Sequence, residues 1–356
     1  MKLIKAALSL WLFATPAFAD GGERIGVLVS SYGDVDNPDE AKDLVINTVG
    51  DPDVIGLPRF MSRPIAVAGW QMVSRETLEE YQAIGGGTNF RATSQLQADS
   101  VASYLRSKGY MATGYAGFTM TTPGVASALA RAQADGINKL VVFYQGAQYS
   151  HVSTYIVFRE VKKYLAMHPE WQVDVVGVKS FYKDPEFIDL VASNIEQRLN
   201  SAEFRSASEI CLFLPMHGNV MKWTEKGDPY YYQTLESIAA IRTRFPNLQV
   251  EYGFQNHDQF PGIKWTQPKD EATLTNLAQK SCSHVIINGQ LTFTVDNLET
   301  LYDQAIGERN FLSEKSGGSK TIFVEKMFNN DQRFAEILGN IAIKALNDDG
   351  DLEKLN

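Results

Sequence analysis

A single histidine follows an apolar run in the middle of the chain. Residues 210–214 have the apolar character of a buried strand, and His217 and Gly218 come shortly after them. In open α/β sheets, the carboxyl ends of strands present catalytic and ligand-binding side chains. Histidine can accept or donate a proton near neutral pH, since its unperturbed pKa is about 6.5. A hydrogen-bonded structural histidine is an equally good interpretation of His217 taken alone.

A second stretch contains three carboxylates at helical spacing. Asp296, Glu299 and Asp303 are three and four residues apart, directly after the apolar segment 291–295. On a helix this spacing places all three on one face, where they repel one another unless a cation or proton lies among them. A solvated helix face is the alternative. Because the row follows a strand-like run, we expect it to begin at the same sheet edge as His217.

Alternating strands and helices are expected to position these two stretches. Each strand-like run is followed by a segment of helical length and pattern, which is typical of parallel sheets built from βαβ units. The pattern predicts an α/β fold with two similar Rossmann-like lobes, parallel sheets and a cleft between the lobes. The first lobe is expected over 20–172, the second over 173–330, and a C-terminal helix and tail over 331–356. The predicted strands are 25–30, 112–118, 139–144, 173–178, 210–214, 249–254 and 284–287.

One apolar segment does not fit this alternation. Pro58 and Pro64 interrupt residues 57–73, which are otherwise rich in apolar and aromatic side chains. We predict either a loop packed on the core or a mobile apolar flap over a ligand pocket.

The N-terminus has the pattern of a secretory signal peptide. Residues 1–19 combine two early lysines, an apolar stretch and a small-x-small motif before Asp20, so export to the periplasm is expected. No other stretch is apolar enough to span a membrane. The net charge is −9, or −9 − 2 = −11 without Lys2 and Lys5, which argues against a nucleic-acid partner. The two cysteines, Cys211 and Cys282, exclude a four-cysteine iron–sulfur cluster; they could pair or remain buried thiols.

Six short blocks occur in an order and spacing that resemble those of the ferrochelatase family, along almost the whole chain after the leader. They are Ile84–Thr88, Gln148–Ser150 with Ser153 and Thr154, Met216–Gly218, Lys226–Tyr230, Lys264 and Trp265 with Pro268, and Asp296 with Leu298–Tyr302. The resemblance implies two Rossmann-like lobes around a porphyrin cleft, and insertion of ferrous iron into protoporphyrin. It implies a porphyrin or haem and a divalent metal as substrates, with no tightly bound cofactor.

The resemblance also implies roles for individual residues. His217 matches the active-site histidine of the family and Glu299 the glutamate that faces it, with Asp303 and Asp296 as further metal-side carboxylates. These types suit the reaction, because two pyrrole protons must leave as a divalent metal approaches. The residues expected to contact the flat ring are Tyr32, Tyr149, Ser150, Trp223, Trp265 and Phe293. Taken singly, each of the aromatics Tyr149, Trp223, Trp265 and Phe293 fits a position in the core better than one in the wall of a ligand site.

Several departures from the family keep other hypotheses open. Proline and methionine precede His217 where relatives usually have serine and alanine, and an arginine common in the family is missing from 114–120. The predicted leader would direct the chain to a different compartment from that of biosynthetic ferrochelatases. We therefore expect a periplasmic chelatase that inserts a metal or removes iron from haem, with possible haem-uptake partners. A non-catalytic haem or porphyrin carrier and a cobalt chelatase for corrin precursors are the alternatives.

Overall fold

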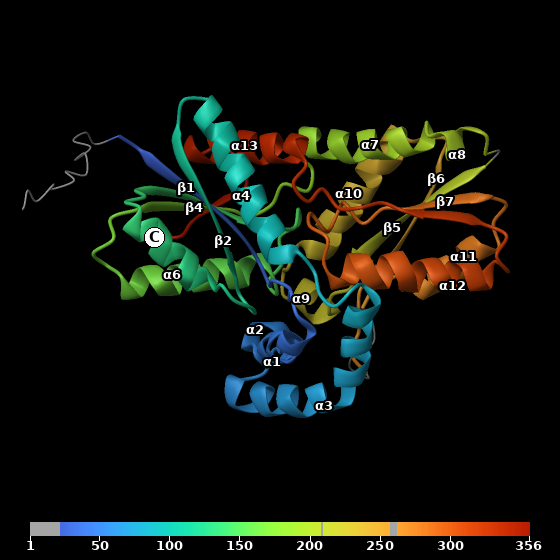
Figure 1. The fold of residues 1–356 in the computed structure, drawn as a ribbon, viewed down its shortest axis with the longest axis horizontal. Coiled ribbons are helices and arrows are strands. Elements are labelled where there is room, and N and C mark those ends of the chain that lie inside the picture. The colour runs from blue at the N-terminus through green and yellow to red at the C-terminus, as the bar shows by residue number, and fades with distance from the viewer. Residues whose placement is uncertain (1–21, 208, 257–261) are drawn as a thin grey trace, which may run out of the picture.

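The computed structural model of the protein describes residues 22–207, 209–256 and 262–356, and the predicted signal peptide lies outside them. Two sheets stand side by side and helices cover both faces of each (Figure 1). The first sheet has the order β2-β1-β3-β4-β9 and the second the order β6-β5-β7-β8. All pairings in both sheets are parallel except that of β9. The predicted α/β class with two parallel sheets is confirmed.

Apolar strands form the centre of both sheets. The first contains β1 (Arg24–Ser31), β2 (Met111–Phe118), β3 (Lys139–Tyr144), β4 (Asp174–Val178) and β9 (Leu352–Lys354). The second contains β5 (Ile210–His217), β6 (Gln249–Gln255), β7 (His284–Ile287) and β8 (Thr321–Val324). Strands buried on both faces read as continuous apolar runs, which explains why most of them were predictable.

The division between the two sheets differs from the predicted lobe boundary. The run 173–178 was expected to open the second lobe, but β4 pairs with β3 in the first sheet, with Val141 opposite Val176. The chain passes from the first sheet to the second between β4 and β5. The C-terminal tail also returns to the first sheet, where β9 pairs with β4 in antiparallel orientation. Sequence order alone does not say which neighbour a strand pairs with.

The covering helices pack on alternating residues of the strands. Val27 and Val29 contact one apolar cluster together with α4 and α13, whereas Leu28 belongs to a cluster on the other face with α5 and α6. The helices of the first sheet are α4 (Phe90–Ser107), α5 (Val125–Ala134), α6 (Thr154–Met167) and α13 (Gln332–Leu346). Those near the second sheet are α7 (Pro185–Leu199), α8 (Ala202–Arg205), α9 (Met221–Glu225), α10 (Tyr230–Arg244), α11 (Asp270–Ala278), the π-helix η2 (Glu299–Glu308) and α12 (Arg309–Lys315).

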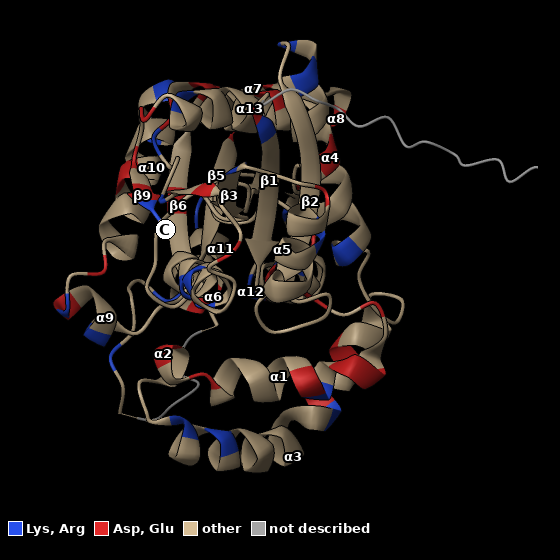
Figure 2. Cartoon of the chain, turned by 90° about the vertical axis from the view of Figure 1, so that its left-hand side faces the viewer, with Lys and Arg blue, Asp and Glu red and all other residues tan. Residues whose placement is uncertain are grey.

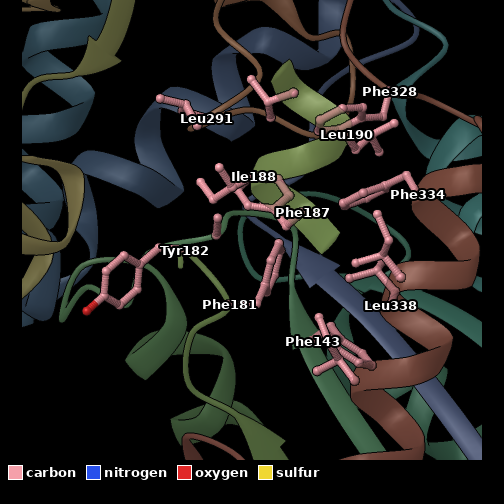
Figure 3. Close-up of a cluster of buried hydrophobic side chains, with 14 of the residues drawn as sticks. Phe143, Phe181, Tyr182, Phe187, Ile188, Leu190, Leu291, Phe328, Phe334 and Leu338 are labelled. Carbon is pink, nitrogen blue, oxygen red and sulfur yellow. The ribbon is translucent and has the colours of Figure 1, made fainter. Parts of the chain in front are cut away.

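One hydrophobic core joins the two halves of the molecule. Phe143 of β3, Phe187 of α7 and Phe334 of α13 lie in one buried cluster (Figure 3). Leu212 and Leu214 of β5 belong to the same cluster. The rings of Phe328 and Phe334 stack with their centroids 4.6 Å apart. The two sheets therefore share a core, which fixes their strand ends relative to each other.

A helical excursion lies below the sheets in Figure 1, between β1 and α4. It consists of η1 (Pro38–Glu40), α1 (Ala41–Gly50), α2 (Pro52–Ile55) and α3 (Arg59–Ala83). The segment 57–73, predicted as a loop or flap, is instead part of α3, with Pro64 inside the helix. Proline removes one helical hydrogen bond, to the carbonyl of Phe60. Because Phe60 is 78% exposed, water can reach this turn and the helix continues.

A disulfide between Cys211 and Cys282 connects the beginning of β5 to the loop before β7. Of the two alternatives for the cysteines, the structure therefore contains the pair. Within the described ranges, no helix is both long and apolar enough to cross a bilayer.

Candidate functional site

His217 and Glu299 meet where the second sheet ends. His217 is the last residue of β5, and Glu299 is the first residue of η2. The imidazole Nε2 lies 3.5 Å from the carboxylate Oε2, and the two side chains are 41% and 27% exposed. The structure therefore brings together the two residues that the sequence placed at one sheet edge, and both can be reached from solvent.

The hydrogen bond on the other side of the ring sets the tautomer of His217. Nδ1 lies 2.6 Å from the backbone carbonyl of Gly218, which can only accept, so Nδ1 carries the proton. In neutral imidazole, Nε2 then has its lone pair directed toward Glu299. A lone pair and a carboxylate oxygen repel each other unless a proton or a cation lies between them. The pair is therefore arranged to capture one or the other.

Two amide side chains fix the carboxylate of Glu299. Its Oε2 accepts hydrogen bonds from Gln255 Nε2 at 2.8 Å and from Asn256 Nδ2 at 2.9 Å. Asn256 has a positive φ of 54°, a conformation that asparagine tolerates better than most residues. Gln304 of η2 donates to Gln255 Oε1 at 3.0 Å, which connects this network to the next turn of the helix.

The helix that carries Glu299 is a π-helix over ten residues. Because its hydrogen bonds run to i+5, residues four and five apart lie on the same side, which groups Glu299, Gln304 and Glu308. Gln304 and Glu308 are buried, and burial raises the pKa of Glu308 well above its ordinary value. Burial, and then the charge of Glu299, raise the pKa of Asp303 to about 8. π-Helices are rare and often mark functional sites.

A buried aspartate after β1 holds the start of this helix. Asp34 Oδ2 accepts a hydrogen bond from the backbone N–H of Leu298 at 2.8 Å. Its Oδ1 accepts from the Tyr81 hydroxyl at 2.5 Å and from the N–H of Val35 at 2.7 Å. Asp34 therefore ties the first sheet and α3 to the residue before Glu299.

Three tyrosines surround the pair. Tyr230 donates a hydrogen bond to the backbone carbonyl of His217 at 2.9 Å. Tyr32 donates to the carbonyl of Val152. Burial, with a contribution from the Glu299 charge, raises the pKa of Tyr32, Tyr144 and Tyr230. These phenols therefore stay neutral near the carboxylate.

The residues expected to contact the ring are divided between the site and the interior. Phe293 lies edge-on to the imidazole of His217, with ring centroids 6.4 Å apart, and Tyr32 is near Glu299. Trp223 is buried and stacks on His151, and Trp265 is buried opposite Val220.

Tyr149 and Ser150 contact residues other than the His217–Glu299 pair. Tyr149 lies under the ammonium of Lys179. Ser150 is buried, and its hydroxyl donates to Asp228 at 2.9 Å. In this structure the Ser150 hydroxyl therefore holds the loop after β3 to Asp228.

The predicted carboxylate row is shorter than expected. Asp303 is close enough to Glu299 to feel its charge, but Asp296 lies before the helix begins. The Asp296 oxygens accept hydrogen bonds from the N–H of Met327 at 3.1 Å and from Asn329 Nδ2 at 2.8 Å. Asp296 therefore anchors the loop after β8, and the structure separates it from the other two carboxylates.

Ligand sites are sparse in the described part of the chain. It contains no group of three or more histidine, cysteine, aspartate or glutamate side chains arranged to hold a metal ion. The larger of two described surface hollows, about 830 Å³, lies on α3, and its lining does not include His217 or Glu299. The pair and this hollow are therefore separate features of the molecule.

Sequence reasoning missed the residues that support the pair. Gln255 ends β6 and Asn256 follows it directly, as His217 ends β5, and Tyr144 ends β3. The strand-end argument could therefore have found all three. Asp34 and Gln304 had no local signal, because their roles depend on tertiary contacts.

The fold and site define an α/β protein with two parallel sheets and a histidine–carboxylate pair at a strand end beside a π-helix. The ferrochelatase family model matches residues 24–346. The chain belongs to the ferrochelatase family, whose members are tetrapyrrole metal chelatases. The predicted family is confirmed.

Individual relatives are distant but cover most of the chain. A ferrochelatase of Trichormus variabilis is 26% identical over 330 residues, which are 91% of this chain and 83% of that protein. A ferrochelatase of Nostoc punctiforme is 27% identical over 300 residues, covering 83% of this chain and 75% of that protein. Among solved structures, SirB from Bacillus subtilis with Fe3+ matches with a TM-score of 0.52 at 9% identity, covering 92% of this chain and 99% of SirB. The likeness to SirB shows a shared fold.

Proposed function

We propose that this chain is an exported chelatase that transfers a divalent metal, with ferrous iron as the first candidate, between solution and a porphyrin. In the forward direction the metal enters the ring and two pyrrole protons leave. In the reverse direction two protons enter and iron is released from haem. One site serves both directions, and the periplasmic location that the leader indicates would favour removal.

The orientation of the His217–Glu299 pair carries this proposal. A lone pair on Nε2 faces a carboxylate oxygen at 3.5 Å, with Nδ1 already committed to a backbone carbonyl. During insertion, Nε2 accepts one pyrrole proton and Glu299 accepts the second or attracts the incoming cation. During removal the same groups return the protons.

The surroundings keep this pair ready to act. Gln255 and Asn256 hold the carboxylate in place, so little reorganisation accompanies proton transfer. Phe293 lies beside the imidazole and offers an apolar edge to a flat ring. The exposure of His217 leaves room for a substrate to approach.

The test follows metal transfer by absorbance in both directions without oxygen. Purified protein is incubated with protoporphyrin and ferrous iron, or with haem and an iron chelator, beside His217→Ala and the control variant His168→Ala. His168 is also near the surface, but it follows α6 and stacks on Tyr164 of that helix. We expect His217→Ala to reduce the rate by about 10²–10⁴-fold, as for a positioned acid–base group, and His168→Ala to leave it unchanged.

Two results would contradict the proposal. One is the absence of metal-dependent turnover in either direction. The other is a loss of less than about threefold in His217→Ala, well below the usual effect of removing an acid–base group. Stoichiometric binding of haem without turnover would instead identify the chain as a carrier.

A further inference from the structure

Two neighbouring side chains of η2 have buried oxygen atoms that lack a hydrogen-bond donor. Gln304 is fully buried and Glu308 is 5% exposed. Among the described residues, no group donates to Gln304 Oε1 or to either carboxyl oxygen of Glu308. The two residues are four apart on the helix, a spacing at which side chains are neighbours. Because a buried acceptor without a donor is costly, these three oxygens indicate a donor that the heavy atoms alone do not provide.

The amide groups that lead from Glu299 toward Glu308 have a fixed direction. The carboxylate of Glu299 only accepts hydrogen bonds, so Gln255 has to present Nε2 to it, at 2.8 Å. The Oε1 of Gln255 then accepts from Gln304 Nε2 at 3.0 Å. This leaves Gln304 Oε1 as the acceptor at the far end of the chain of amides. The direction of the whole chain therefore requires a donor at that end.

The surroundings of Glu308 favour a protonated carboxyl. The helix η2 continues into α12, and α12 shares an apolar cluster with α11 (Figures 1 and 2). Burial, followed by the charges of Asp270 at the start of α11 and of Asp303 on η2, raises the pKa of Glu308 well above its ordinary value. In the part of the chain that the structure describes, no hydrogen-bond donor, charged or neutral, contacts the Glu308 oxygens.

A proton fits these oxygens better than a metal ion does. Gln304 and Glu308 together offer three oxygens from two side chains, whereas Mg²⁺ and Ca²⁺ take about six or more. The described ranges contain no group of three or more histidine, cysteine, aspartate or glutamate side chains arranged to hold a metal ion. A protonated carboxyl supplies one donor and keeps an acceptor. That single donor matches the single requirement of Gln304 Oε1.

We propose that Glu308 holds a proton and donates it in a hydrogen bond to Gln304 Oε1. This bond orients the amide of Gln304, which orients Gln255, and Gln255 holds the Glu299 oxygen that faces His217. Glu308 is therefore a positioning residue that acts on the pair from inside the protein. Only the kinetic consequence of this inference rests on the proposed chelatase function.

Infrared spectroscopy tests for the proton without any turnover. Near neutral pH, the purified protein should show a carbonyl band of a buried carboxylic acid that is absent from Glu308→Gln. The control Glu314→Gln, at an exposed glutamate of α12, should keep this band. The proposal is overturned if Glu308→Gln loses only carboxylate absorption, because Glu308 then is ionised or holds a cation.

A matched pair of variants tests the positioning role. Glutamine and methionine are both uncharged and similar in length to glutamate, but only glutamine can donate to Gln304 Oε1. In the metal-transfer assay we expect Glu308→Met to lower kcat about tenfold with little change in KM, the size of one lost hydrogen bond. Glu308→Gln should restore most of the kcat. Equal losses in the two variants, or a kcat of Glu308→Met equal to that of Glu314→Met, would overturn the proposal.

The side-chain amide of Gln255 reports on the same chain of hydrogen bonds independently of activity. Its N–H resonances, assigned by NMR with the help of Gln255→Leu, should shift in Glu308→Met and remain in place in Glu308→Gln. This pattern in a protein without turnover would reject the chelatase function and support the role of Glu308. Unshifted resonances in Glu308→Met would reject that role even in an active enzyme. Circular dichroism checks folding, and should Glu308→Met not fold, the infrared comparison with Glu308→Gln still decides whether Glu308 holds the proton.

Discussion

At the scale of single residues, the ionisation of the site depends on burial and on the charge of a neighbouring carboxylate. Glu299 has two amide donors, while Asp303, one turn further on, lies half-buried near it. Burial and the Glu299 charge raise the pKa of Asp303 from 3.8 to about 8. Near neutral pH this group therefore holds a proton that an arriving cation can displace.

The raised pKa of Asp303 predicts that the folded protein loses stability as the pH rises. A carboxyl whose pKa is higher in the folded state than in the unfolded state stabilises the fold fully when the pH is below its unfolded-state pKa. That contribution is lost as the pH rises through its folded-state pKa. We expect Asp303→Asn to match the unmodified chain near pH 4 and to exceed its stability at pH 9, on the order of 2 kcal/mol after allowance for partial exposure. Urea unfolding across this range measures the difference. Equal stability at both ends of the range would contradict the raised pKa.

At the scale of elements, the π-helix determines which residues face the pair. An α-helical row of Asp296, Glu299 and Asp303 was a reasonable expectation from spacing, but the helix starts at Glu299 and has the wider π pitch. Nothing in the local sequence distinguishes that pitch. Its position depends on Asp34, which is distant in sequence and bonds to the N–H of Leu298.

Asp34 is therefore a positioning residue for Glu299. The side chain of Asn cannot accept all three hydrogen bonds that Asp34 accepts, so Asp34→Asn should release the start of η2. We expect a loss of stability of about 1 kcal/mol, as for other helix caps, and a fall in kcat with little change in KM. Asp39→Asn, at an aspartate of the same excursion, is the control. A fall in stability without any change in kcat would restrict Asp34 to a structural role.

The predictability of these elements follows from how local their signals are. Buried strands such as β1, β3 and β5 appear in the sequence as apolar runs. The pairing of β4 with β3 and the short strand β9 have no such signal, because sheet order is set by long-range contacts. Pro58 and Pro64 made α3 unpredictable from the sequence, because proline usually interrupts a helix. The exposed position of α3 explains why Pro64 is tolerated. Of the site, the sequence indicated His217 and Glu299, while their supports Gln255 and Asn256 went unnoticed.

At the scale of the whole molecule, a common core and one disulfide hold the strand ends that carry the site. The core cluster includes residues from both sheets, so the sheets cannot separate without exposing it. The Cys211–Cys282 bond ties β5, which ends in His217, to the segment before β7.

The disulfide predicts a difference between oxidised and reduced protein. The two cysteines are 71 residues apart, and closing a loop of that length contributes about 4 kcal/mol in the chain-entropy account. Cys211→Ala/Cys282→Ala should therefore unfold at a lower denaturant concentration than the oxidised chain, and reductant should shift only the unmodified protein. Unfolding that is insensitive to reductant in both proteins would show that the bond contributes nothing.

The most direct test of the central claim is a double-mutant cycle on the pair, in the anaerobic metal-transfer assay. If His217 and Glu299 act as one unit on a single macrocycle, His217→Ala and Glu299→Gln should each reduce the rate by about 10²–10⁴-fold, and the double variant should be no slower than the slower single one. The account would be contradicted if the rate losses of the two single variants multiplied in the double variant. It would also be contradicted if neither substitution changed the rate.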